Sequence, residues 1–185
     1  MPNSHHPLQS AKKDEYSHSR SLLDNFFINS LREMYFAETA IAEEFALIKD
    51  KIVSLKLREI LKTHYEIHLK HKARLEKIFQ QRNECIKSKT CPTFNALLTE
   101  GKNHLSVFSD DIVNWEIALI LLSQKLAHYK IASYGGLAHL AINLNYYKAA
   151  TLLAISVQEE EEYVSKNLDD IISTFLASHV EGYKN

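Results

Sequence analysis

Five ionisable side chains interrupt apolar patterns in this sequence, at positions where a helical protein would normally bury leucine or isoleucine. Three of them are histidines spaced four and three residues apart, a spacing that places their imidazoles along one face of a single helix. Buried carboxylates and imidazoles are costly unless they are paired, hydrogen-bonded or bound to a metal ion. Bundle interiors that carry inward Glu and His from facing helices are also where di-metal carboxylate sites are built. The sequence therefore predicts an internal polar cluster of Glu38, His64, His68, His71 and Glu160.

The same residues also have structural interpretations. The three histidines would be hydrated if their helix extended past the end of a bundle. Glu38 would be satisfied by pairing with one histidine. Neighbouring tyrosines are more often core or rim residues than ligands, and the acidic run at residues 159–162 is typical of a mostly solvated helix face.

Four long helices must position this cluster. Apolar residues recur at alternating intervals of four and three, which is the pattern of one helix face. Ser54 is the expected N-cap of the second helix, and Asp110 or Asp111 that of the third. We therefore expect helices at about residues 22–49, 55–82, 111–142 and 147–178.

The link between the second and third helices, residues 83–110, is long and contains Pro92 and both cysteines. Nothing indicates an oxidising compartment, so Cys85 and Cys91 are expected to be free thiols. A long crossover in the middle of four helices favours a ferritin-like arrangement over a bundle with three short links. The predicted fold class is all-α, a ferritin-like four-helix bundle with a long crossover between its second and third helices.

Composition limits the organisation and the partners. The chain has 185 residues, of which 45% are hydrophobic and 24% charged, enough for one buried core. We expect residues 1–20, which are polar and without periodicity, to form a disordered N-terminal arm, and residues 21–180 to form one domain. A net charge of −1 argues against nucleic acid as a partner. No apolar run is long enough for a membrane span and no secretion signal is evident, so a cytoplasmic location without membrane association is expected.

Five segments resemble, in order and spacing, the YciE/YciF-like ferritin-like stress proteins of bacteria. The resemblance covers about residues 26–172 and is carried by FINSLREMYFAETAI, HYEIHLKHKARLEKIF, KTCPTFNALLTEG, LSQKLAHYKIASYGGL and LLAISVQEEE. It implies a ferritin-like bundle that is usually dimeric, linked to stress, and similar to di-iron or di-manganese carboxylate proteins. Glu38 and Glu160 match acids of that family, and His64 and His128 match its histidines.

The sequence departs from the family at three positions where acids are usual, now Ile67, Ala127 and Lys130. Two glutamates and several histidines cannot easily offset the charge of two divalent ions. Three or four nitrogen and oxygen ligands suffice for one zinc, copper or nickel ion. Two interpretations stay open: a single-ion site, or a metal-free polar core in which Lys130 pairs with Glu38 or Glu160. The candidate metal ligands are Glu38, His64, His68, His71, His128 and Glu160.

The favoured function is a homodimeric, stress-associated protein that has lost the standard di-metal centre and retains at most one divalent ion. Zinc, iron and manganese are the candidate ions. One alternative is an active oxidase, peroxidase or catalase-like enzyme with a rearranged ligand set. Another is a metal-free module that binds a partner, with a basic stretch as its contact surface: Lys70, Lys72, Arg74, Lys77 and Arg82.

Overall fold

The described part of the chain, residues 7–182 of a computed structural model, is helical and contains no strand. This confirms the predicted all-α bundle. The elements are α1 (Pro7–Ile48), a 3-10 turn (Lys49–Lys51), α2 (Leu55–Gln81), α3 (Pro92–Val107), α4 (Ile112–Asn143), α5 (Tyr147–Tyr163), a π-helical segment (Val164–Leu168) and α6 (Asp169–Gly182).

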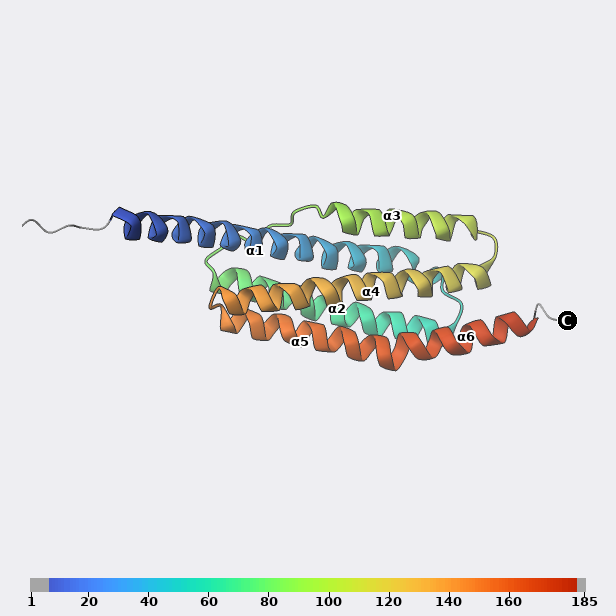
Figure 1. Ribbon diagram of the computed structural model, residues 1–185. Helices are drawn as coiled ribbons and strands as arrows, with labels where there is room; N and C mark the ends of the chain where they lie inside the picture. Colours follow the sequence, from blue (N-terminus) through green and yellow to red (C-terminus); the bar gives the residue numbers. More distant parts are fainter. Residues whose placement is uncertain (1–6, 183–185) are drawn as a thin grey trace, which may run out of the picture.

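The long helices lie side by side in an elongated bundle, with the start of α1 and the end of α6 at opposite ends (Figure 1). Helices α5 and α6, joined by the π-helical segment, replace the single fourth helix that the sequence predicts. Helix α3 lies in the long connection between α2 and α4 and packs on α4, so the predicted crossover is present. None of the described helices is both long and apolar enough to traverse a membrane.

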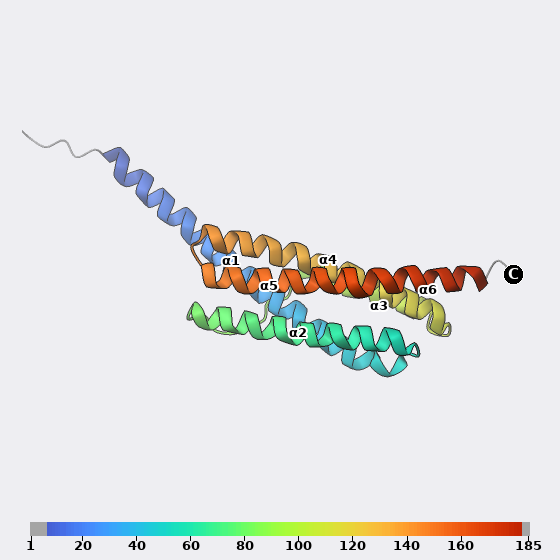
Figure 2. The same ribbon diagram turned by 90° about the horizontal axis from the view of Figure 1, so that it is seen from below.

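Helix α1 begins at Pro7, well before residue 22, where the sequence pattern places its start. Figure 2 shows its first turns extending away from the other helices. Residues 1–6 of the expected N-terminal arm lie outside the described residues. The division into an arm and one domain stays a prediction.

Local signals set the other helix ends. The Ser54 hydroxyl accepts a hydrogen bond from Leu57 N (3.3 Å), and the Asp111 carboxylate accepts one from Asn114 N (3.2 Å). Both satisfy amide groups that a first helical turn leaves without a partner, as predicted for these caps. Asn145 adopts a φ of 65°, in the left-handed region that asparagine tolerates, and turns the chain from α4 into α5.

Apolar residues from all four long helices form two main cores, one toward each end of the bundle. One contains Phe27, Leu31, Phe79 and Leu137, and the other contains Leu57, Trp115, Leu119 and Leu168. Tyr134 belongs to the first core, whereas Ala127 and Tyr163 belong to the second. The predicted polar cluster lies between them.

Candidate functional site: a lysine-centred polar cluster

Each of the four long helices contributes to one buried polar cluster. Helix α1 supplies Glu38, α2 supplies the three histidines, α4 supplies Lys130 and Tyr134, and α5 supplies Glu160. No residue in this set is more than 5% exposed. Of the alternatives raised by the sequence, the hydrated histidine face at a bundle end is therefore wrong: His64, His68 and His71 are buried.

Lys130 lies at the centre of this cluster. Its Nζ atom is 3.1 Å from Glu38 Oε1 and 2.7 Å from His68 Nδ1, and it also donates to Glu160 Oε1. A lysine ammonium has three N–H groups, and these three atoms are all potential acceptors. The buried cation thus exchanges its water for three protein partners, two of them carboxylates.

Glu38 receives further hydrogen bonds. The Tyr134 hydroxyl donates to Glu38 Oε1 over 2.6 Å, and His71 Nδ1 lies 3.2 Å from the same oxygen. His68 Nδ1 lies 2.8 Å from Glu38 Oε2 and donates to it in the tautomer that carries the proton on Nδ1, whereas in the other neutral tautomer Nδ1 accepts from Lys130 instead. Burial alone would raise the pKa of Glu38, but the Lys130 charge and the histidine hydrogen bonds hold it well below its ordinary value. Glu38 is therefore a carboxylate near neutral pH. Burial, and then this carboxylate, raises the pKa of Tyr134.

Glu160, the second carboxylate in contact with Lys130, has a similar environment. His64 Nε2 lies 2.9 Å from Glu160 Oε2, and the Tyr163 ring stacks on His64 with centroids 3.8 Å apart. Burial opposes ionisation here as well, yet Lys130 and His64 keep the pKa of Glu160 below its ordinary value. Two ionised carboxylates thus flank one buried ammonium.

The histidines next to Lys130 are held neutral. Burial, and then the charge of Lys130, lowers the pKa of His68 to about 3. Burial also lowers the pKa of His64, against the opposing effect of Glu160. Two neutral imidazoles, two carboxylates and one ammonium leave these five groups with a net charge of about −1 near pH 7.

The network reaches the protein surface through His71. His71 Nε2 lies 3.2 Å from Glu159 Oε2, and Arg74 binds Glu159 with two hydrogen bonds of 2.6 and 2.7 Å. The sequence interpretation placed Glu159 and Arg74 on solvated faces and so missed this bidentate pair. Their separation of 85 residues leaves no local pattern that would have revealed it.

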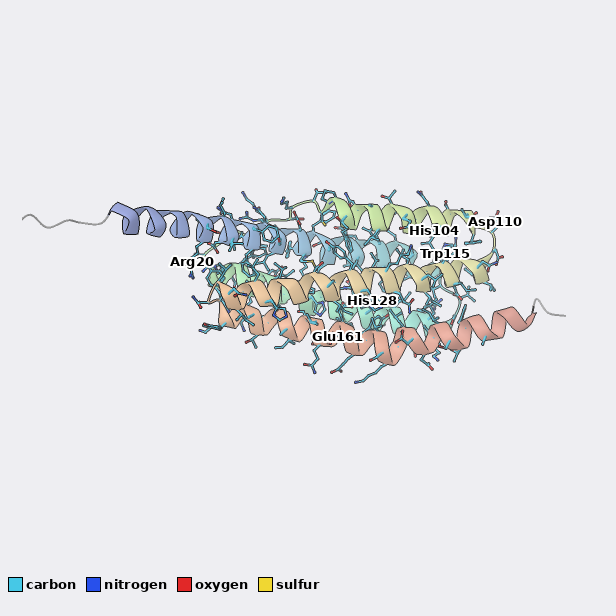
Figure 3. All side chains as sticks on the ribbon, in the orientation of Figure 1. Arg20, His104, Asp110, Trp115, His128 and Glu161 are labelled. Atoms are coloured by element: carbon cyan, nitrogen blue, oxygen red, sulfur yellow. The ribbon has the colours of Figure 1, made fainter. Side chains whose placement is uncertain are left out.

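The structure brings together five of the six predicted site residues and leaves out the sixth. His128, which Figure 3 labels on α4, is exposed and lines a groove between α3 and α4. Successive residues of an α-helix are about 100° apart, so His128 and Lys130 point in nearly opposite directions from α4. Tyr134, one turn after Lys130, is the buried partner that a helical spacing from Lys130 would have indicated.

Residues 22–180 match a family described as a domain of unknown function, DUF892. The chain belongs to the DUF892 family. It is 31% identical to the protein YciF of Escherichia coli strain K12 over 140 residues, which are 75% of this chain and 84% of YciF.

Two solved structures are similar to this DUF892 chain. The crystal structure of the E. coli stress protein YciF gives a TM-score of 0.76 at 29% identity and covers 84% of this chain and 97% of YciF. The structure of YcfI from Rhodopseudomonas palustris gives a TM-score of 0.75 at 24% identity, with 80% and 92% of the two chains covered, and supports the fold alone. The sequence resemblance to YciF-like proteins is therefore confirmed.

A pair of divalent metal ions, which that resemblance implies, does not fit the residues of this DUF892 chain. The Lys130 ammonium lies between the two carboxylates that would have to bridge such ions, and like charges at this range repel strongly in a buried site. Ile67 and Ala127 supply no further oxygen ligands.

A single ion has a more compact set of donors. His64, His68 and Glu160 each offer one ligand atom, and these atoms lie within 4.8 Å of one another. Two of the three residues also contact the Lys130 ammonium, so an ion bound there would compete with this internal cation.

Proposed function

We propose that this chain is a stress-associated, non-enzymatic member of the DUF892 family, in which Lys130 balances the core carboxylates in place of a di-metal centre. The observation that carries the proposal is the contact of one buried ammonium with Glu38, Glu160 and His68. The association with stress is supported by the similarity to YciF, whose crystal structure is described as that of a stress protein.

Metal content tests the proposal. The full-length protein, incubated anaerobically with ferrous iron or manganese and then desalted, should retain neither ion in stoichiometric amount. Lys130→Glu should gain metal because it removes the cation and adds a carboxylate ligand. Lys125→Glu is the matched control, since Lys125 lies on the same helix but is exposed. Two iron or manganese ions per wild-type chain would overturn the proposal.

Activity assays on the metal-loaded protein test the enzymatic alternative. An oxidase, peroxidase or catalase-like enzyme built on a rearranged ligand set must hold a redox metal ion. Iron-loaded or manganese-loaded wild-type protein should therefore consume peroxide and oxidise ferrous iron no faster than buffer does. Faster turnover that is lost in Glu160→Gln would favour the enzyme.

A second candidate function is the binding of one divalent ion, favoured by the close donor atoms of His64, His68 and Glu160. Zinc is the best probe because it accepts nitrogen and oxygen ligands in a tetrahedral site. In zinc titrations at pH 7.5, His68→Ala should weaken binding by more than about 10- to 100-fold. That range is typical for the loss of a residue that only orients a metal ligand by a hydrogen bond, and the loss of a ligand itself should cost more. His139→Ala should have no effect, since His139 is exposed. Equal affinities in the two variants would show that the histidines serve structure only.

We propose a cytoplasmic homodimer that does not bind nucleic acid. Two residues of the basic stretch on α2 already have acidic partners, because Arg74 pairs with Glu159 and Arg82 pairs with Asp24 at 3.0 Å. Their charge is largely offset within the protein, which supports an ordinary helix surface over a phosphate-binding one.

A further inference from the structure

A small cavity of about 100 Å³ lies beside the polar cluster, between helices α1, α2, α3 and α4. Most of its wall is apolar and comes from all four helices, with Ile41, Leu61, Leu98 and Leu126 among the buried lining residues. Glu44 and Lys102, an ion pair of 2.5 Å on the exposed side, also line it. The cavity therefore extends from the surface between α1 and α3 to the histidines of α2.

The inner part of this cavity includes an unsatisfied polar atom. His68 lines the cavity and is 2% exposed, and its Nδ1 edge is turned toward Glu38 and Lys130. Among the described residues, the buried His68 Nε2 has no hydrogen-bond partner. A buried nitrogen without a partner is costly, and so it usually indicates a bound water or ligand group.

We propose that this cavity binds a small, neutral, mostly apolar molecule that carries one hydroxyl group, which pairs with His68 Nε2. The hydrocarbon part of the ligand packs against the apolar wall of the cavity. A hydroxyl can both donate and accept, so it satisfies Nε2 in either neutral tautomer of the imidazole. Phenols and short-chain alcohols are the ligand class that combines these features.

Size and charge narrow the ligand further. A closed apolar cavity of about 150 Å³ holds benzene. This space is about one third smaller, but it opens to the surface beside Glu44 and Lys102, so a small ring or a short alkyl chain can extend toward that opening. The adjacent Glu38 and Glu160 carboxylates outnumber the single ammonium of Lys130. An anionic ligand such as a carboxylate would add a like charge beside them, which disfavours it.

Matched probes test the hydroxyl. Phenol and toluene have nearly the same shape, with a hydroxyl in phenol where toluene has a methyl group. Benzoate carries the negative charge that the neighbouring carboxylates disfavour. Each is titrated into the full-length, isotopically labelled protein while the side-chain NMR signals of the leucines and of the His68 ring are followed. Phenol should bind saturably, about 2- to 10-fold more tightly than toluene, the range expected for one hydrogen bond. Only phenol should shift the His68 ring nitrogen signal, and benzoate should not bind.

Cavity-filling variants test the location. Leu98→Phe fills the cavity from α3, and Ser123→Leu fills it from α4, so phenol affinity should fall at least about 10-fold in each variant that retains the wild-type helical circular dichroism. Leu97→Phe is the control, because Leu97 lies next to Leu98 but does not line the cavity. Absence of saturable phenol binding, unchanged affinity in both filled variants, or equal affinity for phenol and toluene would overturn the proposal. None of these readouts involves metal, so they are independent of the metal-content test above.

Discussion

At the scale of single residues, Lys130 determines what the core of this protein can do. A buried ammonium loses its hydration, and only well-placed acceptors compensate for that loss. Here Glu38, Glu160 and His68 do so, and in return Lys130 keeps both carboxylates ionised. The three charges therefore depend on one another, and removal of Lys130 leaves both carboxylates without a counter-charge.

Replacing Lys130 by Met should destabilise the protein by roughly 3–5 kcal/mol, because two buried carboxylates then lose their counter-charge. Urea unfolding followed by circular dichroism measures the loss. Adding Glu38→Gln and Glu160→Gln to Lys130→Met should recover part of it, because the carboxylates that had lost their partner are then neutral. A single Lys130→Met variant as stable as the wild type would contradict the role assigned to this ion pair.

Stability should also fall as the pH is lowered from about 7. The pKa values of His64 and His68 are lowered by folding, so below about 6.5 the unfolded chain binds protons that the folded protein excludes. Below that pH, each histidine lowers the free energy of unfolding by up to about 1.4 kcal/mol for every pH unit. The pKa values of Glu38 and Glu160 are also lowered by folding. Their ionised forms therefore stabilise the folded protein fully above about pH 4.5, and this stabilisation is lost as the pH falls below that value.

Urea midpoints measured at pH 7.5, 6.0 and 5.0 check this dependence. His68→Gln should flatten the slope between pH 6 and 5, whereas exposed His139→Gln should leave it unchanged. A midpoint that stays constant over this range would show that His64 and His68 are protonated in the folded state.

The sequence predicted those site residues that interrupt an apolar pattern. Glu38 and His68 stand where leucine would be normal, so their burial could be inferred. The pairing of Lys130 with the two glutamates was left open against a single-ion site, since spacing alone cannot locate the end of a long side chain. Arg74 and Glu159 could not be found, because charged residues on a helix resemble a solvated face until the opposing helix is placed.

At the scale of elements, capping signals were predictable and the irregular turn of the last long helix was not. Ser54 and Asp111 cap α2 and α4 as expected from their residue types. The π-helical segment Val164–Leu168 has no propensity signal, although it directly follows Tyr163 at the polar cluster. Such segments change which residues face inward, and they are frequent at functional sites.

A carboxylate from α4 also stabilises the start of α2, a contact that the sequence did not reveal. Glu116 is 4% exposed, and its Oε1 atom accepts hydrogen bonds from Val53 N (2.7 Å) and Ser54 N (2.8 Å). Glu116→Leu should lower the free energy of unfolding by about 1–3 kcal/mol, because both amides lose their acceptor. Glu116→Gln keeps an acceptor oxygen and should cost less than half as much by urea unfolding. Equal losses in the two variants would show that the charge, and not the acceptor, matters.

At the scale of the whole molecule, the order of the long helices and the crossover followed from periodicity and from the scarcity of glycine and proline. These signals are local and repeat over many turns, so single exceptions do not obscure them. The cavity beside His68 depends on the relative placement of four helices. Its volume is set by side chains that are distant in sequence, and no pattern in one helix encodes it.

The groove between α3 and α4 is where we expect two copies of the chain to meet. Leu121 is 45% exposed there, next to Phe108 and Ile117, and exposed apolar residues that gather in one groove favour a protein contact. Where the wild type forms the proposed dimer, Leu121→Lys should therefore shift it toward monomer in light scattering after size exclusion. Leu47→Lys should not, although Leu47 is 78% exposed, because it lies on α1 outside the groove. If both variants stay dimeric, the subunits meet on another face. If the wild type is a monomer at all concentrations, the groove has no role in self-association, and its exposed leucine is one of the isolated apolar side chains common on protein surfaces.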